Sequence, residues 1–380
     1  MSRPNIFNYA TKELSQDAMI CWFLECLNSE DEEYRQLGLN FVRFIFNDNE
    51  IKEAKLFNNS FPKTQYEKID VYAEIVINGT VYPVIFEDKT NTYLHDEQMY
   101  KYCKKIKKAI NTKAYKKQVN DINYNSGKII YIYFKSGYAS KWEKYDIANK
   151  QNKVKEGESK SNKEAIDNVV FKEIYLENIV EFLNKQTSSD ILFTDYRDHL
   201  RKLHEKRNKI LNNYMTTPTE CSHALDEDNQ TVSFLLLEKI FGKCWIEYTA
   251  NNKLAIVYPF YTLDKNQNKI FYNLGLTGRN GKYYFRFEQW QKEDKLQTKR
   301  DEAKKIQKFC KKITEDYSSF EFPPLRETLN NSYKIFKFHI NKNYSIEETC
   351  KIIKKVVDEI ATNFETKPLD ITKEKDWENK

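Results

Sequence analysis

Glycine and proline are scarce in this sequence, which contains 9 and 8 of them among 380 residues. That scarcity excludes a collagen-like or low-complexity chain. Long hydrophobic runs are also missing: the longest unbroken apolar stretch is Ala18 to Leu24, whereas a membrane helix needs about 18 residues or more. Residues 1–17 contain no signal-peptide core. We therefore expect a soluble, cytoplasmic protein that neither spans a membrane nor enters the secretory route.

Close pairs of cysteine and histidine are also lacking. The seven cysteines occur singly, without any Cys-x-x-Cys, and the five histidines are equally dispersed. This spacing excludes a zinc finger or ribbon, and it is typical of reduced thiols in a cytoplasm. Any bound metal is therefore expected to have oxygen ligands.

Aromatic and charged residues are plentiful instead. The 24 Phe and 26 Tyr provide the buriable surface of a folded core, which a disordered chain lacks. The net charge of +6 is too small to identify a partner. Its distribution is uneven, because residues 101–117 contain eight lysines and no acidic residue.

Length and composition together predict two domains, since a typical domain has roughly 100–200 residues. The mostly polar stretch 143–168 is expected to be a long surface loop. A second polar break follows at residues 216–230. We predict a first domain over residues 1–215, a linker over 216–230 and a second domain over 231–380.

The first domain is predicted to be α/β, with element order αβββαβ and a mixed sheet flanked by helices. Apolar spacing and Val, Ile and Tyr content indicate these elements in turn: helices over 14–26 and up to about 46, strands over 51–57, 69–77 and 80–89, a helix over 94–110, a strand over 128–135 and a charged helix over 190–213.

The second domain is predicted to be α+β with an antiparallel sheet, because several aromatic strands precede a helix. Its expected elements are strands over 244–249, 254–261, 269–276 and 283–290, a helix over 299–313, a strand over 334–340 and a helix over 346–364. Target recognition, partner binding and dimerisation all remain open for this domain.

The clearest chemical pattern lies in the hairpin that Asn78-Gly79 is predicted to close with a type I′ turn. In that register Asp70 lies directly opposite Glu87, and strand alternation places Lys89 on the same face. Opposed carboxylates repel each other, and a divalent cation would remove the repulsion. Oxygen ligands of this kind suit Mg²⁺ or Mn²⁺, which could activate water against a phosphodiester.

The same residues have an ordinary interpretation. Asp, Glu and Lys are common on exposed strands, and Glu-x-Lys occurs by chance in most chains of this length. Spacing alone therefore leaves both interpretations open.

The ordered set of features resembles the PD-(D/E)XK nuclease superfamily, whose restriction-endonuclease-like core has the order αβββαβ. The resemblance covers roughly residues 5–135 and, loosely, the helix that follows near residue 190. It implies that Asp70 and Glu87 bind metal, that Lys89 assists catalysis, and that the main-chain carbonyl of Asp88 adds a ligand while its side chain faces away. Ile69 replaces the proline of the family pattern.

Helix residues complete what the resemblance implies. Glu13 maps onto a first-helix glutamate that often completes the metal site, although the helix dipole alone also favours an acid there. Gln98 and Tyr102 map onto a Gln-x-x-x-Tyr that follows the catalytic strand, although residues at this spacing also simply touch on a helix surface. Gln98 is therefore placed with the catalytic residues and Tyr102 with those that contact nucleic acid.

The lysine-rich helix is the candidate phosphate-binding surface. Lys101, Lys104 and Lys108 are expected to contact nucleic acid, the alternative being a merely solvated face. The expected function is a Mg²⁺- or Mn²⁺-dependent nuclease acting on DNA, and the resemblance implies restriction or anti-phage defence. The alternatives are a catalytically inactive nucleic-acid- or protein-binding module of the same fold, or a ribonuclease. A homodimer or a defence-system partner protein are the candidate assemblies.

Overall fold

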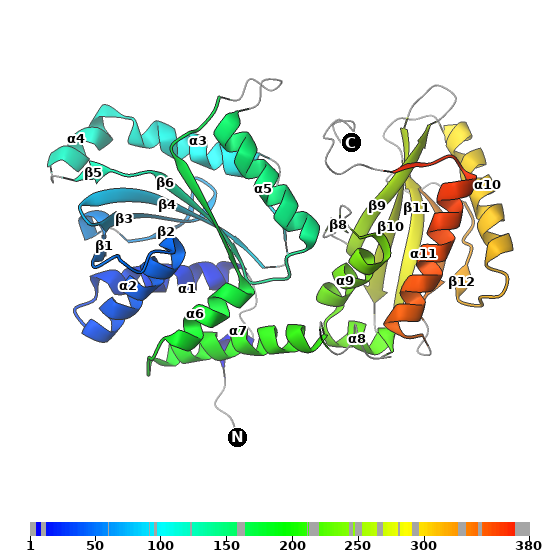
Figure 1. The fold of residues 1–380 in the computed structure, drawn as a ribbon, viewed down its shortest axis with the longest axis horizontal. Coiled ribbons are helices and arrows are strands. Elements are labelled where there is room, and N and C mark those ends of the chain that lie inside the picture. The colour runs from blue at the N-terminus through cyan, green and yellow to red at the C-terminus, as the bar shows by residue number, and fades with distance from the viewer. Residues whose placement is uncertain are drawn as a thin grey trace. The chain divides into compact units, whose positions relative to one another are not determined.

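The computed structural model describes residues 5–8, 13–59, 61–90, 92–94, 97–121, 124–157, 164–210, 212, 220–242, 246–247, 253–263, 269–279, 282–290, 296–325, 332–340 and 344–368. The chain divides into two compact units: residues 1–139 with 143–205, and residues 140–142 with 206–380. Each unit has its own sheet and helices (Figure 1).

A mixed sheet forms the centre of the first unit, with the strand order β1-β3-β4-β6-β7. β3 is antiparallel to β1 and β4, whereas β4, β6 and β7 run parallel to one another. The strands are β1 (Ala54–Leu56), β2 (Lys63–Tyr66), β3 (Ile69–Ile77), β4 (Thr80–Lys89), β5 (Asn125–Ser126), β6 (Ile129–Lys135) and β7 (Val169–Tyr175). The helices are α1 (Glu13–Glu25), α2 (Glu32–Phe46), α3 (Gln98–Ile110), α4 (Lys113–Asp121), α5 (Lys141–Glu156), α6 (Leu176–Lys185) and α7 (Ile191–Lys209).

The predicted hairpin is confirmed, because β3 and β4 have the expected bounds. Asn78 and Gly79 both have positive φ, 47° and 75°, as a type I′ turn requires. Pairing runs from Ile77 opposite Thr80 to Val71 opposite Phe86. This register carries the next pair, Asp70 and Glu87, onto one face of the sheet.

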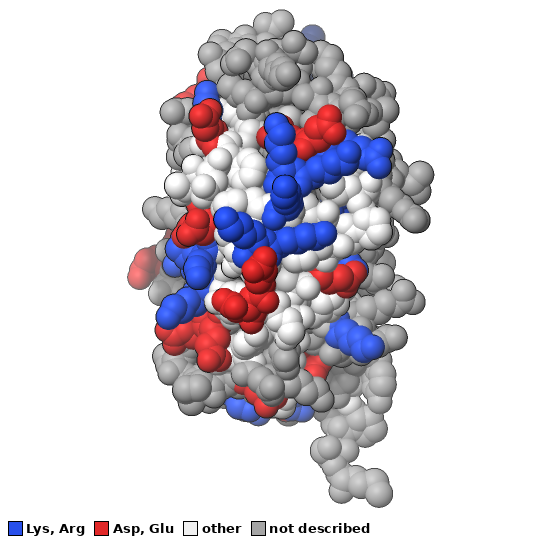
Figure 2. All heavy atoms as spheres, turned by 90° about the vertical axis from the view of Figure 1, so that its right-hand side faces the viewer, with Lys and Arg blue, Asp and Glu red and all other residues white. Residues whose placement is uncertain are grey.

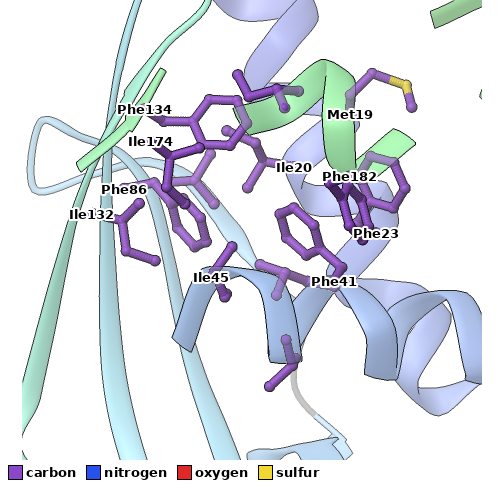
Figure 3. Close-up of a cluster of buried hydrophobic side chains, with 14 of the residues drawn as sticks. Met19, Ile20, Phe23, Phe41, Ile45, Phe86, Ile132, Phe134, Ile174 and Phe182 are labelled. Atoms are coloured by element: carbon purple, nitrogen blue, oxygen red, sulfur yellow. The ribbon is translucent and has the colours of Figure 1, made fainter. Parts of the chain in front are cut away.

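A hydrophobic core covers each face of this sheet, so the sheet lies between two layers of helices. One core lies against α1, α2, α6 and α7, and includes Phe23, Phe41, Phe86 and Phe182 (Figure 3). Phe23 and Phe41 stack with ring centroids 4.8 Å apart. The other core lies against α3 and α5. The carboxyl ends of β4 and β6 therefore lie between layers, where water has limited access.

The expectation of a long loop over residues 143–168 is wrong, because α5 occupies residues 141–156. The buried stripe of α5 follows helical spacing, with Glu143, Ile147 and Val154 at most 2% exposed. Because Glu143 is one of these buried residues, a search for apolar residues at helical spacing does not detect this helix. The predicted helix over 94–110 is shorter than expected and begins at Gln98.

Several elements of the first unit were not expected from the sequence, among them β2, α4, β5, β7 and α6.

The expected linker over 216–230 is also partly wrong. Residues 213–219 lie outside the described residues, but α8 (Cys221–Glu227) and the start of α9 (Asn229–Phe241) fall within it. Both helices belong to the second unit.

The second unit contains an antiparallel sheet with helices, as predicted. Its strand order is β12-β13-β11-β10-β9-β14, with β8 paired to β9. The strands are β8 (Ile246–Glu247), β9 (Lys253–Leu263), β10 (Lys269–Arg279), β11 (Lys282–Trp290), β12 (Phe320–Glu321), β13 (Ser332–His339) and β14 (Lys367–Pro368). The remaining helices are α10 (Leu296–Ile313) and α11 (Ile346–Asn363).

Surface charge on the second unit is mixed on the face that Figure 2 shows. Lysine and arginine side chains gather near its middle, with acidic side chains beside them. The described residues of this face therefore form no uniformly basic surface of the kind that tracks a phosphate backbone.

Buried thiols are a shared feature of the cysteines in the described part of the chain. The six cysteines that the structure describes are buried and form no disulfide with one another. Burial raises the pKa of the Cys221 thiol to about 12. None of the described helices combines the length and apolar character that crossing a membrane requires.

Candidate active site

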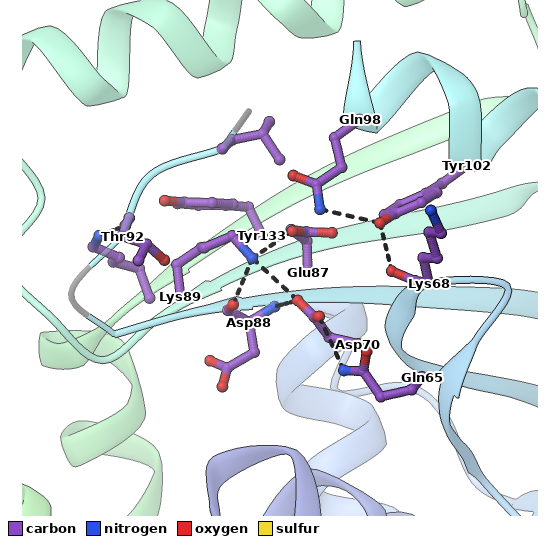
Figure 4. Close-up of polar contacts among 12 residues, drawn as sticks. Gln65, Lys68, Asp70, Glu87, Asp88, Lys89, Thr92, Gln98, Tyr102 and Tyr133 are labelled. Carbon is purple, nitrogen blue, oxygen red and sulfur yellow. Dashed lines mark hydrogen bonds and ion pairs between the residues drawn. The ribbon is translucent and has the colours of Figure 1, made fainter. Parts of the chain in front are cut away.

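Three charged side chains converge where the β3–β4 hairpin meets the start of α3. The Lys89 Nζ atom lies 2.5 Å from Glu87 Oε1 and 3.2 Å from Asp70 Oδ2 (Figure 4). The hairpin register explains the convergence, because Asp70 and Glu87 occupy opposed positions and Lys89 follows Glu87 by two residues. The structure thus brings together the three side chains to which the sequence assigned catalysis.

Burial makes the balance of charge at this site important. The Glu87 side chain is fully buried, and the side chains of Lys89 and Asp70 are 7% and 17% exposed. A buried carboxylate is costly unless a cation accompanies it. The sequence predicted two carboxylates that repel each other, but the Lys89 ammonium contacts both of them and compensates that repulsion.

Asp88 divides its contacts between the two faces of β4. Its carbonyl oxygen accepts a hydrogen bond from Lys89 Nζ at 2.9 Å, and its N–H donates to Asp70 Oδ2 at 3.0 Å. Its side chain lies on the opposite face, where Gln16 Nε2 of α1 donates to Asp88 Oδ1 at 2.7 Å. The carbonyl therefore belongs to the site, whereas the carboxylate helps to fix β4 against α1.

The oxygen atoms around Lys89 Nζ fit a hard divalent cation. They come from Glu87, Asp70 and the Asp88 carbonyl, all within 2.5 to 3.2 Å of the ammonium, so a positive charge is already accommodated there. Mg²⁺ uses a few such oxygens and keeps several waters. Among the residues that the structure describes, no group of three or more His, Cys, Asp or Glu side chains could hold a metal. The Glu13 side chain lies outside those residues.

Gln98 and Tyr102 form a hydrogen-bonded pair that fastens α3 beside the site. Gln98 Nε2 donates to the Tyr102 hydroxyl at 3.0 Å, and that hydroxyl donates to the carbonyl of Lys68 (Figure 4). Tyr102 is only 7% exposed, and burial raises the pKa of its hydroxyl. In this structure Tyr102 therefore makes a structural contact between α3 and the segment before β3, and its contact with nucleic acid stays a prediction.

The predicted phosphate-binding lysines lie on the exposed side of α3. Lys101, Lys104 and Lys108 are all exposed, whereas the opposite side of the helix is buried. Lys101 forms an ion pair with Glu97 at 3.0 Å, and the Lys104 ammonium lies 5.6 Å from the Tyr100 ring centroid. These contacts are weak enough to exchange for phosphate.

An unusual backbone segment precedes Asp70. Gln65, Glu67 and Lys68 have positive φ values of 53°, 53° and 71°, a conformation that costs a non-glycine residue about 1–3 kcal/mol. Side chains of α3 hold the segment: Lys105 Nζ lies 2.6 Å from Glu67 Oε2, and Tyr102 donates to the Lys68 carbonyl. Gln65 Nε2 lies 3.4 Å from Asp70 Oδ1. The surrounding contacts therefore fix the approach to Asp70.

A second buried ion pair adjoins the site and was not predicted. Lys135 lies beside Lys89 in the parallel pairing of β4 and β6, and its ammonium lies 2.9 Å from Glu143 Oε1. Glu143 also accepts a hydrogen bond from Tyr133, and Lys135 Nζ donates to the Thr92 carbonyl at 2.5 Å. This network holds the chain that follows Lys89. The sequence signal for it was the helical spacing of Glu143 and Ile147, which polar neighbours obscured.

No family model matches this chain, and comparisons with curated proteins and with solved structures found no match either. Function is therefore inferred from the geometry of the chain's own residues.

Proposed function

We propose that the first unit is a metal-dependent nuclease that hydrolyses DNA phosphodiester bonds. The observation that carries the proposal is the convergence of Asp70, Glu87 and the Asp88 carbonyl on Lys89 at the ends of adjacent strands. A fully buried carboxylate and a nearly buried ammonium are costly in a core that serves only for packing. Their arrangement suits phosphodiester hydrolysis better than simple packing.

The arrangement of elements also supports a restriction-endonuclease-like core. α1 precedes an antiparallel set of β1, β3 and β4, and α3 then connects β4 to the parallel strand β6. This is the order αβββαβ with α2, β2, α4 and β5 added. The candidate residues lie on the second and third strands of that set, where the PD-(D/E)XK pattern expects them.

Each residue has a defined chemical task in this proposal. Asp70, Glu87 and the Asp88 carbonyl would hold Mg²⁺ or Mn²⁺, and the ion would supply Lewis-acid stabilisation of the phosphoryl oxygen and help to activate water. The Asp88 N–H keeps the Asp70 carboxylate oriented at 3.0 Å. The Lys89 ammonium would contact the phosphate, where it would stabilise the charge that develops as water attacks. Gln98 borders the same space from α3.

DNA is the proposed substrate because an exposed lysine surface lies on the helix beside the site. Lys101, Lys104 and Lys108 share the solvent side of α3, and α3 begins next to Glu87 and Lys89. Neutralising these three lysines is expected to weaken DNA binding and to reduce its salt dependence, because fewer counterions are released. An unchanged affinity and salt slope would show that the lysines form only a solvated surface.

The testing experiment incubates the full chain with supercoiled, linear and single-stranded DNA and with RNA, in Mg²⁺, Mn²⁺ or EDTA. We expect DNA cleavage that EDTA stops and that Asp70→Asn abolishes. The matched control is Glu181→Gln, which removes an exposed carboxylate from α6, on the opposite face of the sheet, and should leave cleavage intact. Cleavage of RNA alone would change the substrate, and a parent chain inert on every nucleic acid would favour the binding-module interpretation.

Melting curves test metal binding independently of cleavage. A metal at one hundred times its dissociation constant stabilises the folded state by about 2.7 kcal/mol. We expect the parent chain to gain stability from Mg²⁺ or Mn²⁺ and the Asp70→Asn variant to gain none. An equal gain in both proteins would place the metal elsewhere.

A further inference from the structure

A cavity of about 290 Å³ lies along the same sheet as the candidate active site. β2, β3, α3, α4 and the segment before β2 enclose it, with Phe61, Lys63 and Gln118 exposed at its mouth. Its volume is close to the lower end, about 300 Å³, of small-molecule sites. It is thus suited to a flat group no larger than a nucleobase.

Strand alternation links the cavity to the active site. Asp70, Tyr72 and Glu74 occupy alternate positions on β3 and so lie on one face. Glu74 lies about 13 Å along the strand from Asp70, at about 3.3 Å per residue. α3 also extends from the active site to the cavity, because Tyr102 contacts the segment before Asp70 and Ile106 lines the cavity. A nucleic-acid strand that reaches Asp70 can therefore also reach the cavity.

The walls of the cavity are aromatic. Tyr66 and Tyr72 stack with ring centroids 5.3 Å apart and an interplanar angle of 27°. Phe57 and Tyr115 form a further wall, with centroids 6.5 Å apart. Such rings provide stacking partners for a base, and base stacking does not depend on sequence.

One carboxylate lies among these rings. Glu74 Oε1 accepts a hydrogen bond from the Tyr72 hydroxyl at 2.9 Å, and Tyr115 lines the same cavity. A carboxylate can accept about four hydrogen bonds, so Tyr72 orients Glu74 and leaves it capacity for a ligand. The group that matches it is a pair of adjacent N–H donors in a flat ring.

Lys63 decides which kind of flat ligand the cavity favours. Its ammonium lies 4.8 Å from the Tyr66 ring centroid at the mouth, where it already occupies an aromatic face. It would repel an organic cation, the other common ligand of an aromatic cavity with a carboxylate. It would attract the phosphate attached to a base.

We propose that this cavity binds a guanine base of the substrate strand, with Glu74 accepting its adjacent N–H groups, the tyrosine rings stacking on it and Lys63 contacting its phosphate. Guanine presents neighbouring N1–H and N2–H₂ donors on one edge, whereas the other DNA bases lack such a donor pair for a carboxylate. The inference rests on the nuclease function proposed above. It predicts that the nuclease prefers a guanine a few nucleotides from the bond that it cuts.

The experiment measures binding of the full chain to fluorescein-labelled single-stranded oligothymidylate that contains one central guanine, adenine or cytosine, in EDTA so that no strand is cut. We expect the guanine oligonucleotide to bind about tenfold more tightly, the size of one good bidentate contact. Glu74→Gln should remove this preference while binding of plain oligothymidylate is unchanged. The control variant, Glu181→Gln, should keep the preference.

A second variant keeps the test decisive if Glu74→Gln does not fold. Tyr115→Leu removes a ring from the cavity wall and should weaken binding of all the oligonucleotides without altering their order. Equal binding of the three oligonucleotides by the parent chain, or a guanine preference that survives Glu74→Gln, would overturn the proposal. Competition by tetramethylammonium would instead identify an organic-cation site and would overturn it as well.

Cleavage assays separate this proposal from the nuclease proposal. A parent chain that cuts DNA with Mg²⁺ but binds all bases equally would refute the guanine site and leave the nuclease intact. A parent chain that prefers guanine in EDTA but cuts nothing would refute the nuclease and leave the base-binding site.

Discussion

The two sheets of this chain bury different kinds of side chain. In the first sheet, the ends of β4 and β6 bury Glu87, Asp88, Lys89 and Lys135, none of them more than 6% exposed. In the second sheet, Glu288 is the one buried acidic or basic residue among the strand residues that the structure describes. Rings fill the second core instead, as shown by Phe287, which stacks on Tyr272 at 5.8 Å.

This difference shows where the chain concentrates costly interactions. A buried ion costs several kcal/mol before its partner compensates for it, so packing alone gives no reason to gather four at one end of a sheet. The second sheet buries neutral polar groups such as Asn273 and Gln289, which cost much less. The described part of the first sheet therefore concentrates buried charge, whereas that of the second buries mainly neutral polar groups and rings.

The largest expected effect comes from removing the cation between the carboxylates. Lys89→Met should lower cleavage by about 10²–10³-fold, the usual cost of losing one group that stabilises transition-state charge. It should also lower the metal-free stability of the first unit by about 3–5 kcal/mol, because Glu87 loses its buried partner. Nuclease assays and urea unfolding measure the two effects.

A matched control and a metal titration sharpen this prediction. Lys101→Met removes an exposed ammonium that pairs with Glu97 and should change stability by less than about 1 kcal/mol. Mg²⁺ should raise the melting temperature more in Lys89→Met than in the parent chain, since no ammonium competes with it. A smaller rise would contradict the placement of the metal among these oxygens.

The buried pair beside the site should give the next largest effect. Glu143→Gln leaves the Lys135 ammonium, whose side chain is fully buried, without its counterion at 2.9 Å. We expect a loss of about 3 kcal/mol or more in unfolding free energy, measured by hydrogen exchange of the β6 amides. Glu177→Gln is the control, because its ion pair with Lys144 is exposed and should contribute no more than about 1 kcal/mol. Equal losses in the two variants would contradict the comparison.

Glu74 should make the stability of the first unit depend on pH, with a smaller effect than the substitutions of Lys89 and Glu143. Burial raises the pKa of Glu74 above its ordinary 4.5, although the hydroxyls of Tyr72 and Tyr115 and the Lys63 ammonium act in the opposite direction. The folded state therefore holds this proton more tightly than the unfolded state does. Stability falls as pH rises from the ordinary pKa through the raised one, and above it the full penalty applies.

The measurement compares unfolding midpoints of the parent chain and Glu74→Gln across that pH range. The variant should lack this part of the pH dependence and should be relatively more stable at the high-pH end. A difference between the two proteins that does not change with pH would mean that Glu74 titrates normally.

The smallest effect is expected in the second sheet. Gln289→Met keeps the side-chain length and removes a long hydrogen bond of 3.4 Å to the Tyr272 hydroxyl. We expect a change in unfolding free energy within about 1 kcal/mol and no change in cleavage. A loss as large as that of Glu143→Gln would show that the second sheet also depends on its buried polar groups.

The sequence predicted the β3–β4 hairpin residue by residue because two independent signals agree there. Val, Ile and Tyr content defines the strands, and Asn78-Gly79 fixes the turn and thereby the register. That register is enough to bring Asp70, Glu87 and Lys89 together. It also predicted Lys89 next to both acids, and the ion pairs with both carboxylates agree with that prediction.

Sequence patterns failed where a buried position is polar. Glu143 takes a core position of α5 that an apolar pattern would fill with a hydrophobic residue, so the polar sequence predicts a loop where the structure has a helix. Gln16 was not expected to contact Asp88, since that contact joins α1 to β4 across 72 residues of sequence. Such pairs become visible only when the tertiary arrangement is known.

The two-residue turn at Asn78-Gly79 also bears on how the site forms and how the chain can change in length. A hairpin of this kind closes in about 1–10 μs, whereas the parallel pairing of β4 with β6 must first close a longer connection through α3 and α4. Asp70, Glu87 and Lys89 can therefore meet early in folding, before β6 covers them. Insertions and deletions in the connection from α4 to β6 leave these three residues in register, so that is where lineages descended from this sequence can diverge in length.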